Sequence, residues 1–172
     1  MTRYVSIAET MPLDVLPEFM NKYFALNFDE IIKRNGIIDK FEGDKIIAFW
    51  GRFESAKESA QRACESALAQ MDAMNQFYDW AKRNGHPCPE IRIGISAGEL
   101  IVGNLGSSSR IDYTVMGHDV NVAFALQEAA KEFGSCILVS ESTCSLTNGL
   151  EFGDIISIDC CNSKINAHPL IQ

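Results

Sequence analysis

The chain has 172 residues, of which 47% are hydrophobic and 22% are charged. This length and balance are those of one ordinary globular domain with a real hydrophobic core, and they exclude a disordered polypeptide. The net charge of -8 provides no basic surface for nucleic acid or for an anionic membrane, so a ligand that carries phosphates would need local cationic groups or metal ions.

The first half of the chain predicts two helices separated by a β-hairpin. Apolar residues repeat at helical spacing over 13–34, and the Asn-Gly pair that follows ends this helix. The run IIDKFEGDKIIAFWG, 37–51, holds two β-rich stretches around Glu42 and Gly43, which indicates a hairpin. A second helix is expected over about 54–83, again ended by Asn-Gly.

The second half predicts strands grouped around one more helix. Apolar and small residues alternate over 91–106, as in two strands joined by a tight turn, and the glycines there match neither a dinucleotide fingerprint nor a P-loop. Residues 109–117 continue as strand, 119–133 read as helix, and CILVS at 136–140 reads as a buried strand. The terminal segments IISID and HPLIQ are expected to form an edge pair.

Helices that alternate with pairs of strands indicate an α+β sandwich whose sheet is mostly antiparallel. The order of elements resembles a ferredoxin-like, split βαβ pattern whose first strand is missing or truncated. No repeat, linker or low-complexity stretch interrupts the sequence, so residues 1–172 are expected to form a single domain.

Targeting and cysteine patterns favour a cytoplasmic location. No apolar run is long enough for a membrane span, and the N-terminus lacks the order of a signal peptide. The six cysteines contain no CxxC pair and the three histidines show no zinc spacing, which predicts free thiols in a reducing compartment. We interpret HPC at 86–88 as a loop, not as a metal site.

Three segments resemble the class III adenylate and guanylate cyclase catalytic domain, in the same order and with similar gaps. They are DKFEGDKIIAFWG, IRIGISAGELIVGNLGSSSRIDYTVMGHDVNVA and CILVSEST, and the resemblance extends from about Tyr4 to Pro169. It implies a lyase of intracellular signalling that converts ATP to 3′,5′-cyclic AMP and pyrophosphate with two divalent ions, Mg²⁺ or Mn²⁺. A diguanylate cyclase is rejected, because EGDK stands where a GGDEF signature would be.

The resemblance implies two metal-binding aspartates, of which Asp44, beside the predicted turn, matches the second. The first would stand immediately before Met1, and this sequence lacks it. Met1 is then either an internal residue of a longer protein or the true start of a protein that has abandoned two-metal catalysis, and the missing central strand favours the former. An ordinary turn residue is the alternative interpretation of Asp44.

Lys40 and Thr114 match the family's base-reading pair, a donor and an acceptor whose placement suits adenine and not guanine. The resemblance therefore favours ATP. The alternative interpretations are an exposed strand lysine and a β-branched residue that simply favours a strand.

Asn121 matches the asparagine that orients the ribose for attack. A helix N-cap is the alternative role, and Asp119 fits that role better. One helical turn further on, the family usually carries an arginine that stabilises charge on the α-phosphate, but this chain has Ala125. Because losing such a donor costs about 10²–10³ in turnover in comparable sites, we predict a weak cyclase, or one that recruits a substitute cation.

Lys164 matches the lysine that grips the terminal phosphates, and Pro169 has the family's spacing from it. The glycine expected next to that lysine is Ile165, a stiff β-branched residue that would alter the loop. A solvated lysine is the alternative interpretation.

The resemblance implies a head-to-tail homodimer, in which the metal aspartate of one subunit faces the base-reading pair and the asparagine of the other. Coupling to a sensor or regulatory domain is also expected. A second hypothesis is a catalytically silent cyclase-homology module that binds nucleotide or a partner domain. This module is favoured by Ala125 and Ile165, which replace the family's arginine and glycine, and by the absence of the first aspartate. The enzyme is favoured by the retained Asp44, Lys40, Thr114 and Asn121.

Overall fold

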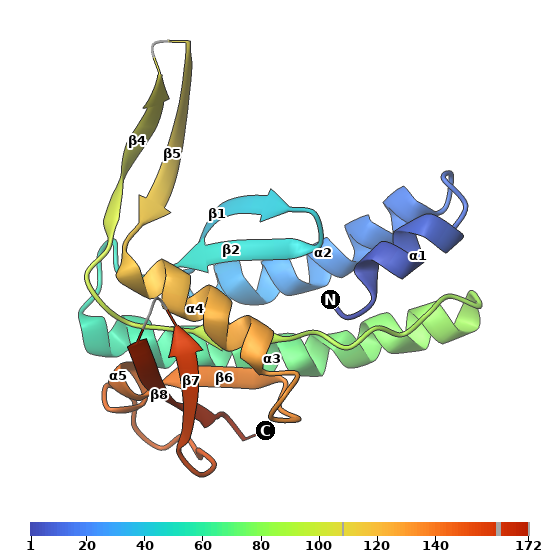
Figure 1. The fold of residues 1–172 in the computed structure, drawn as a ribbon. Coiled ribbons are helices and arrows are strands. Elements are labelled where there is room, and N and C mark those ends of the chain that lie inside the picture. The colour runs from blue at the N-terminus through green and yellow to red at the C-terminus, as the bar shows by residue number, and fades with distance from the viewer. Residues whose placement is uncertain (108, 161–162, 172) are drawn as a thin grey trace.

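A computed structural model of the chain describes residues 1–107, 109–160 and 163–171 (Figure 1). The helices are α1 (Tyr4–Thr10), α2 (Leu16–Lys33), α3 (Ala56–Arg83), α4 (His118–Ala129) and α5 (Glu141–Cys144). The strands are β1 (Ile37–Glu42), β2 (Lys45–Phe49), β3 (Ile93–Ile95), β4 (Ile101–Ser107), β5 (Arg110–Met116), β6 (Ile137–Ser140), β7 (Ile156–Cys160) and β8 (Ser163–Pro169).

Helices α2, α3 and α4 and the first hairpin form where the sequence predicts them, whereas the short helices α1 and α5 were not predicted. Helix α3 begins with a capping box, in which the Ser55 side chain accepts from the Glu58 backbone and the Glu58 side chain accepts from the Ser55 backbone. These reciprocal hydrogen bonds satisfy backbone donors that the first turn leaves unpaired. Asn35 adopts a left-handed φ of 60° after α2, which ends that helix as the Asn-Gly signal indicates.

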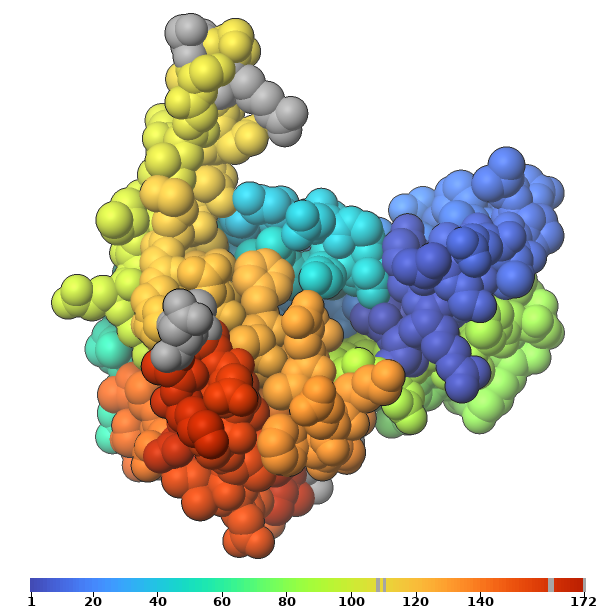
Figure 2. Space-filling view, in the orientation of Figure 1, coloured from blue at the N-terminus to red at the C-terminus, as the bar shows by residue number. Residues whose placement is uncertain are grey.

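The strands form three separate ladders, β1-β2, β4-β5 and a four-stranded sheet in the order β3-β6-β8-β7. All of these pairings are antiparallel except that of β3 with β6, which is parallel. The α+β class with mostly antiparallel pairing is therefore confirmed. The β4–β5 hairpin rises away from the body of the molecule (Figures 1 and 2).

The predicted hairpin within 91–106 is wrong, because β3 pairs with β6 whereas β4 pairs with β5. The reason lies in how β3 packs under α4. A Cβ on Gly94 would lie 2.1 Å from the carbonyl oxygen of Ala123, so this glycine lets the helix approach the strand closely. The prediction that the two terminal segments form an edge pair also needs correction. Of these two strands, β7 lies at the edge of the sheet, whereas β8 lies between β6 and β7.

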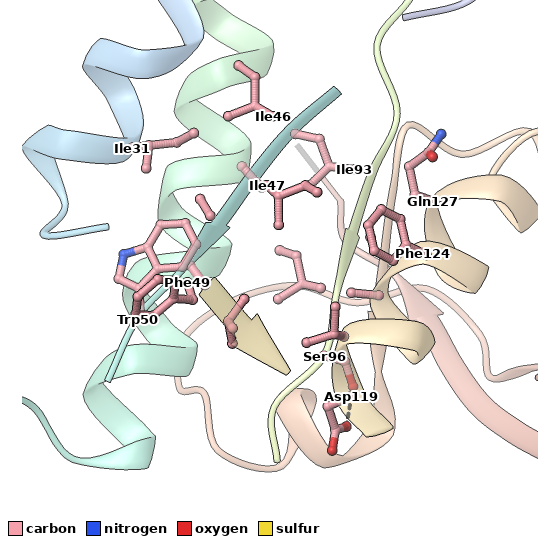
Figure 3. A pocket seen from close by; sticks show the side chains of 18 of the residues that line it. Ile31, Ile46, Ile47, Phe49, Trp50, Ile93, Ser96, Asp119, Phe124 and Gln127 are labelled. Carbon is pink, nitrogen blue, oxygen red and sulfur yellow. Dashed lines mark hydrogen bonds between the residues drawn. The ribbon is translucent and has the colours of Figure 1, made fainter. Parts of the chain in front are cut away.

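A cavity of about 1240 Å³ lies between β2 and β3 (Figure 3). Ile46, Ile47 and Phe49 line one side of it, and Ile93 and Phe124 line the other. Among the described residues, β2 pairs only with β1 and β3 only with β6, so each has an unpaired edge. The cavity therefore separates the β1–β2 hairpin from the four-stranded sheet.

The hydrophobic core is divided into three clusters, two of which include residues of helix α3. One cluster joins α2 and α3, where the Phe19 and Phe77 rings are fully buried with their centroids 5.1 Å apart. Another joins α3 to β6, through contacts of Cys64 and Ala67 with Val139. A third lies between α4 and the four-stranded sheet. The long helix therefore connects the two halves of the molecule.

Cys64, Cys88, Cys136 and Cys144 are free, as predicted, and Cys161 lies outside the described ranges. Burial raises the pKa of the Cys64 thiol to about 12, which leaves it protonated and unreactive at neutral pH. Within the described residues, no helix is both long enough and apolar enough to cross a membrane.

Candidate functional site

Two of the predicted site residues meet although 74 residues separate them in the sequence. Lys40, on β1, donates a hydrogen bond of 2.9 Å from its Nζ to Oγ1 of Thr114, on β5. The Lys40 side chain is half exposed and Thr114 is partly buried. The structure thus joins the side chains predicted to recognise the base, and it leaves the ammonium group accessible to a ligand.

Asp39 completes this cluster, and sequence reasoning missed it. Its Oδ2 accepts a hydrogen bond of 3.1 Å from the Thr114 hydroxyl and lies 3.3 Å from the Lys40 ammonium. Only 2% of the Asp39 side chain is exposed. The only hint in the sequence was the pair of adjacent charged residues in the apolar run IIDKF, and regular alternation of side chains does not by itself show which of the two is buried. We refer to Asp39, Lys40 and Thr114 as the base-reading cluster, after the role predicted for Lys40 and Thr114.

Asp44 lies at the turn between β1 and β2. Gly43 has a φ of 59°, a left-handed conformation that two-residue hairpin turns favour and that glycine adopts without strain. The Asp44 carboxylate lies 2.8 Å from the α-amino nitrogen of Met1, and 16% of its side chain is exposed. Burial, and then the charge of Asp44, raise the pKa of Tyr23.

A carboxylate at an accessible turn fits a magnesium or manganese ion, since Mg²⁺ is commonly held by one or two carboxylates together with water and substrate phosphates. Within the described ranges, no three histidine, cysteine or acidic side chains gather closely enough to hold a metal ion. Asp44 would therefore be one protein ligand for such an ion, and the described residues do not supply a complete set.

Helix α4 carries Asn121 in its first turn, and this residue is exposed. Asp119 is not the helix cap that the sequence suggested. Gly117 holds the N-cap position, and the Asp119 carboxylate instead accepts a hydrogen bond of 2.6 Å from Ser96 (Figure 3). This bond ties α4 to the segment after β3. Ala125 is partly buried against the core cluster beneath α4.

Lys164 lies on β8, exposed and opposite Asp159 of β7. Ile165, at the position where the family has glycine, pairs with Ile158 and packs against the core beneath α4. Regular strand therefore continues through this position. Among the described residues, no hydrogen bond or ion pair joins Asp44, Asn121 or Lys164 to the base-reading cluster.

The family of the chain follows from comparison with known proteins. Residues 2–162 match the model of the adenylate and guanylate cyclase catalytic domain, so the chain belongs to this family. Its similarity to the adenylyl cyclase CyaB from P. aeruginosa gives a TM-score of 0.91 at 27% sequence identity, over 99% of this chain and 89% of that one. The guanylyl cyclase Cya2 has the same fold, with a TM-score of 0.88 at 24% identity, over 99% and 87% of the two chains.

Two of the curated relatives are named adenylate cyclases. Adenylate cyclase 1 of Rhizobium meliloti is 31% identical over 137 residues, which are 80% of this chain and 21% of that protein. The adenylate cyclase of Anabaena cylindrica is 34% identical over 144 residues, which are 81% of this chain and 28% of that protein. This chain thus spans less than a third of the length of these relatives.

Proposed function

We propose that residues 1–172 act as the catalytic domain of a cyclase that converts ATP to 3′,5′-cyclic AMP and pyrophosphate between two copies of the chain. The observation that carries this proposal is the hydrogen bond between Lys40 and Thr114, which unites a cationic donor and a hydroxyl from distant segments. The names of the curated relatives that are adenylate cyclases support ATP as the substrate.

The reaction requires the 3′ oxygen of the ribose to attack the α-phosphorus in line while pyrophosphate leaves. Lys40 and Thr114 hold the base, and Asn121 orients the ribose, so that reacting atoms are placed by geometry and not by random encounter. Lys164 contacts the terminal phosphates. Asp44 would hold Mg²⁺ or Mn²⁺, and the ion would supply the positive charge for the phosphates that a chain of net charge -8 otherwise lacks.

The proposed head-to-tail homodimer is supported by the surface of the β4–β5 hairpin. Large apolar side chains are exposed along it, with Ile101 at 68% and Ile111 at 64% exposure. Exposed apolar side chains gathered on one element indicate an interaction surface. In such a dimer, Asp44 of one copy faces the base-reading cluster and Asn121 of the other. A chain that sediments as a monomer at high micromolar concentration with nucleotide present would contradict this arrangement.

The proposed turnover is weak because the position one turn after Asn121 is Ala125, which offers no charge to the α-phosphate. We also propose a cytoplasmic location and a covalently attached sensor or regulatory domain. The relatives are three to five times longer than their matched segments, which supports additional domains.

A catalytically silent module is the second candidate. Three observations favour it: Ala125 packs against the core, Ile165 continues a regular strand, and Asp44 is not part of a metal-binding group in the described residues. Such a module would still bind ATP through the base-reading cluster and would form the same dimer.

The deciding experiment measures product and binding separately. The purified protein is incubated with ATP or GTP in Mn²⁺, cyclic nucleotide and pyrophosphate are quantified, and ATP binding is followed by equilibrium dialysis. Cyclic AMP formation that Lys40→Met reduces would support the enzyme. ATP binding by a dimeric protein that yields no product would support the silent module, and loss of both binding and product would contradict each candidate.

A further inference from the structure

Asp39 lies at an irregularity in the β1–β2 ladder. Ile38 pairs with Ala48 and Lys40 pairs with Ile47, so Asp39 is an extra residue on β1. Consecutive side chains of a regular strand point to opposite faces, whereas a bulge changes the direction of a side chain. Here both Asp39 and Lys40 reach the same Thr114 hydroxyl. The bulge therefore builds the three-residue cluster.

The burial of Asp39 is unusual for a carboxylate. Its side chain is only 2% exposed, and Oδ1 is buried without a hydrogen-bond partner among the described residues. Burying a charged oxygen without a partner is unfavourable, so the fold tolerates Asp39 at this position at the expense of stability. The second oxygen makes all of the polar contacts, to Thr114 and Lys40.

These contacts fix the direction of the Thr114 hydroxyl. A hydroxyl has one proton and two acceptor lone pairs, whereas an ionised carboxylate can only accept. Thr114 therefore donates its proton to Asp39 and accepts from Lys40. What Thr114 can still offer a ligand is a lone pair, and what Lys40 can still offer is N–H donors.

This pattern distinguishes the two purines. Adenine presents a donor, its exocyclic amine, beside an acceptor, the ring nitrogen N1. Guanine presents the reverse, the acceptor O6 beside the donor N1–H. An acceptor from Thr114 next to a donor from Lys40 complements adenine and opposes guanine at both atoms, and such mismatched polar groups are strong determinants of selectivity.

We propose that Asp39 is a specificity-determining, positioning residue, which makes the site adenine-selective by holding the Thr114 hydroxyl as an acceptor. This inference rests on the proposed binding of a nucleotide base at Lys40 and Thr114. Asp39 acts through Thr114 and need not touch the nucleotide. An asparagine at position 39 can turn its NH2 group toward the hydroxyl, which then accepts from it and is free to donate to O6 of guanine.

The test is the selectivity of Asp39→Asn, a replacement of almost the same shape without the charge. ATP and GTP compete against a fluorescent methylanthraniloyl-ATP, so the readout does not require turnover. The ratio of the Kd for GTP to the Kd for ATP is expected to fall at least about tenfold, chiefly because GTP binds more tightly. A purely structural role would weaken both nucleotides equally. Asp29→Asn, on the exposed face of α2, is the matched control.

Two further variants keep the inference testable if Asp39→Asn does not fold. Thr114→Ser retains the hydroxyl and should keep the preference for ATP, whereas Thr114→Val removes the acceptor and should abolish it. An unchanged preference in Asp39→Asn or in Thr114→Val overturns the role of Asp39 but leaves nucleotide binding intact. A parent protein that binds neither nucleotide overturns the proposed function itself.

Discussion

The base-reading cluster and the region around Asp44, at the turn of the β1–β2 hairpin, differ in how many of their proposed partners lie within one chain. In the cluster, hydrogen bonds of 2.9 and 3.1 Å already hold Lys40 and Thr114 in place. At the turn, the Asp44 carboxylate forms an ion pair with the α-amino group of Met1, and Asn121 stands exposed on α4.

This difference separates recognition from chemistry. Groups held in place before binding lose little conformational freedom when a ligand arrives, so under the proposed function one chain already holds the groups that select the base. The groups proposed for the reaction would need metal ions, phosphates and a second copy of the chain. Three predictions test how independent the two regions are, and a fourth concerns a site away from both.

The largest effect is expected for Asp44→Ala, which removes the carboxylate assigned to the metal. Turnover should fall at least about 10²-fold, whereas the affinity for ATP without metal should stay within about twofold because the base-reading cluster is intact. Initial rates and equilibrium dialysis measure the two quantities. Glu42→Ala, on the other side of the turn, is the control. Equal losses of rate and metal-free affinity would show that the regions are not independent.

The second largest effect is expected for Ala125→Arg. The long stem of arginine can lie along the partly buried surface while its guanidinium reaches the phosphates. Turnover should rise about 10²-fold, with a much smaller change in ATP affinity, because the new charge acts mainly in the transition state. Ala125→Gln supplies similar bulk without charge and should not raise the rate. An unchanged rate in the arginine variant would refute the role assigned to this position.

A third prediction concerns the support of α4. In Gly94→Ala the new methyl group would meet the backbone of Ala123 and Gln127, so the helix must shift. We expect a loss of about 1–3 kcal/mol in the free energy of unfolding and a lower turnover, with metal-free ATP affinity retained. Denaturant titration measures the first quantity. Gly103→Ala, where a Cβ meets nothing within 4 Å, should leave stability unchanged.

The smallest effect lies away from both regions. Hydrogen bonding to Lys33, followed by that to Arg34, lowers the pKa of Glu30 in the folded chain. Glu30 thus stabilises the fold above its ordinary carboxyl pKa, and this contribution is lost as the pH falls through the lowered, folded value. Glu30→Gln should cost about 0.5 kcal/mol at neutral pH and nothing in strong acid. Thermal melts over a pH series, with Asp29→Asn for comparison, measure this difference.

Elements whose local signals were complete could be predicted from the sequence. The Asn-Gly pairs end α2 and α3, and alternating residues around Gly43 form the hairpin. The long-range pairing of Lys40 with Thr114 came from the family resemblance, since nothing in either segment alone indicates the other. Local periodicity carried little information about contacts between distant segments.

The errors share this cause. Residues 91–106 contain two good strands, but which partner each strand takes depends on α4 and β6, far along the chain. Asp119 has the residue type of a helix cap, yet Ser96 supplies a nearer partner that only the tertiary structure creates. Asp39 escaped notice because a bulge, which reverses the expected face of a side chain, has no firm sequence signature.

The dependence of both halves on α3 has a consequence for how the protein opens. No backbone ladder among the described residues crosses from β2 to β3. The α2 side and the four-stranded sheet are joined by side-chain packing along α3, by the hydrogen bonds of Thr114 to Asp39 and Lys40, and by the contact of Lys45 with Phe124. Regions linked in this way tend to open as distinct cooperative units. Amide hydrogen exchange should therefore reveal two levels of protection, one for each half. The two levels should become equal in any state in which the unpaired edges of β2 and β3 are joined.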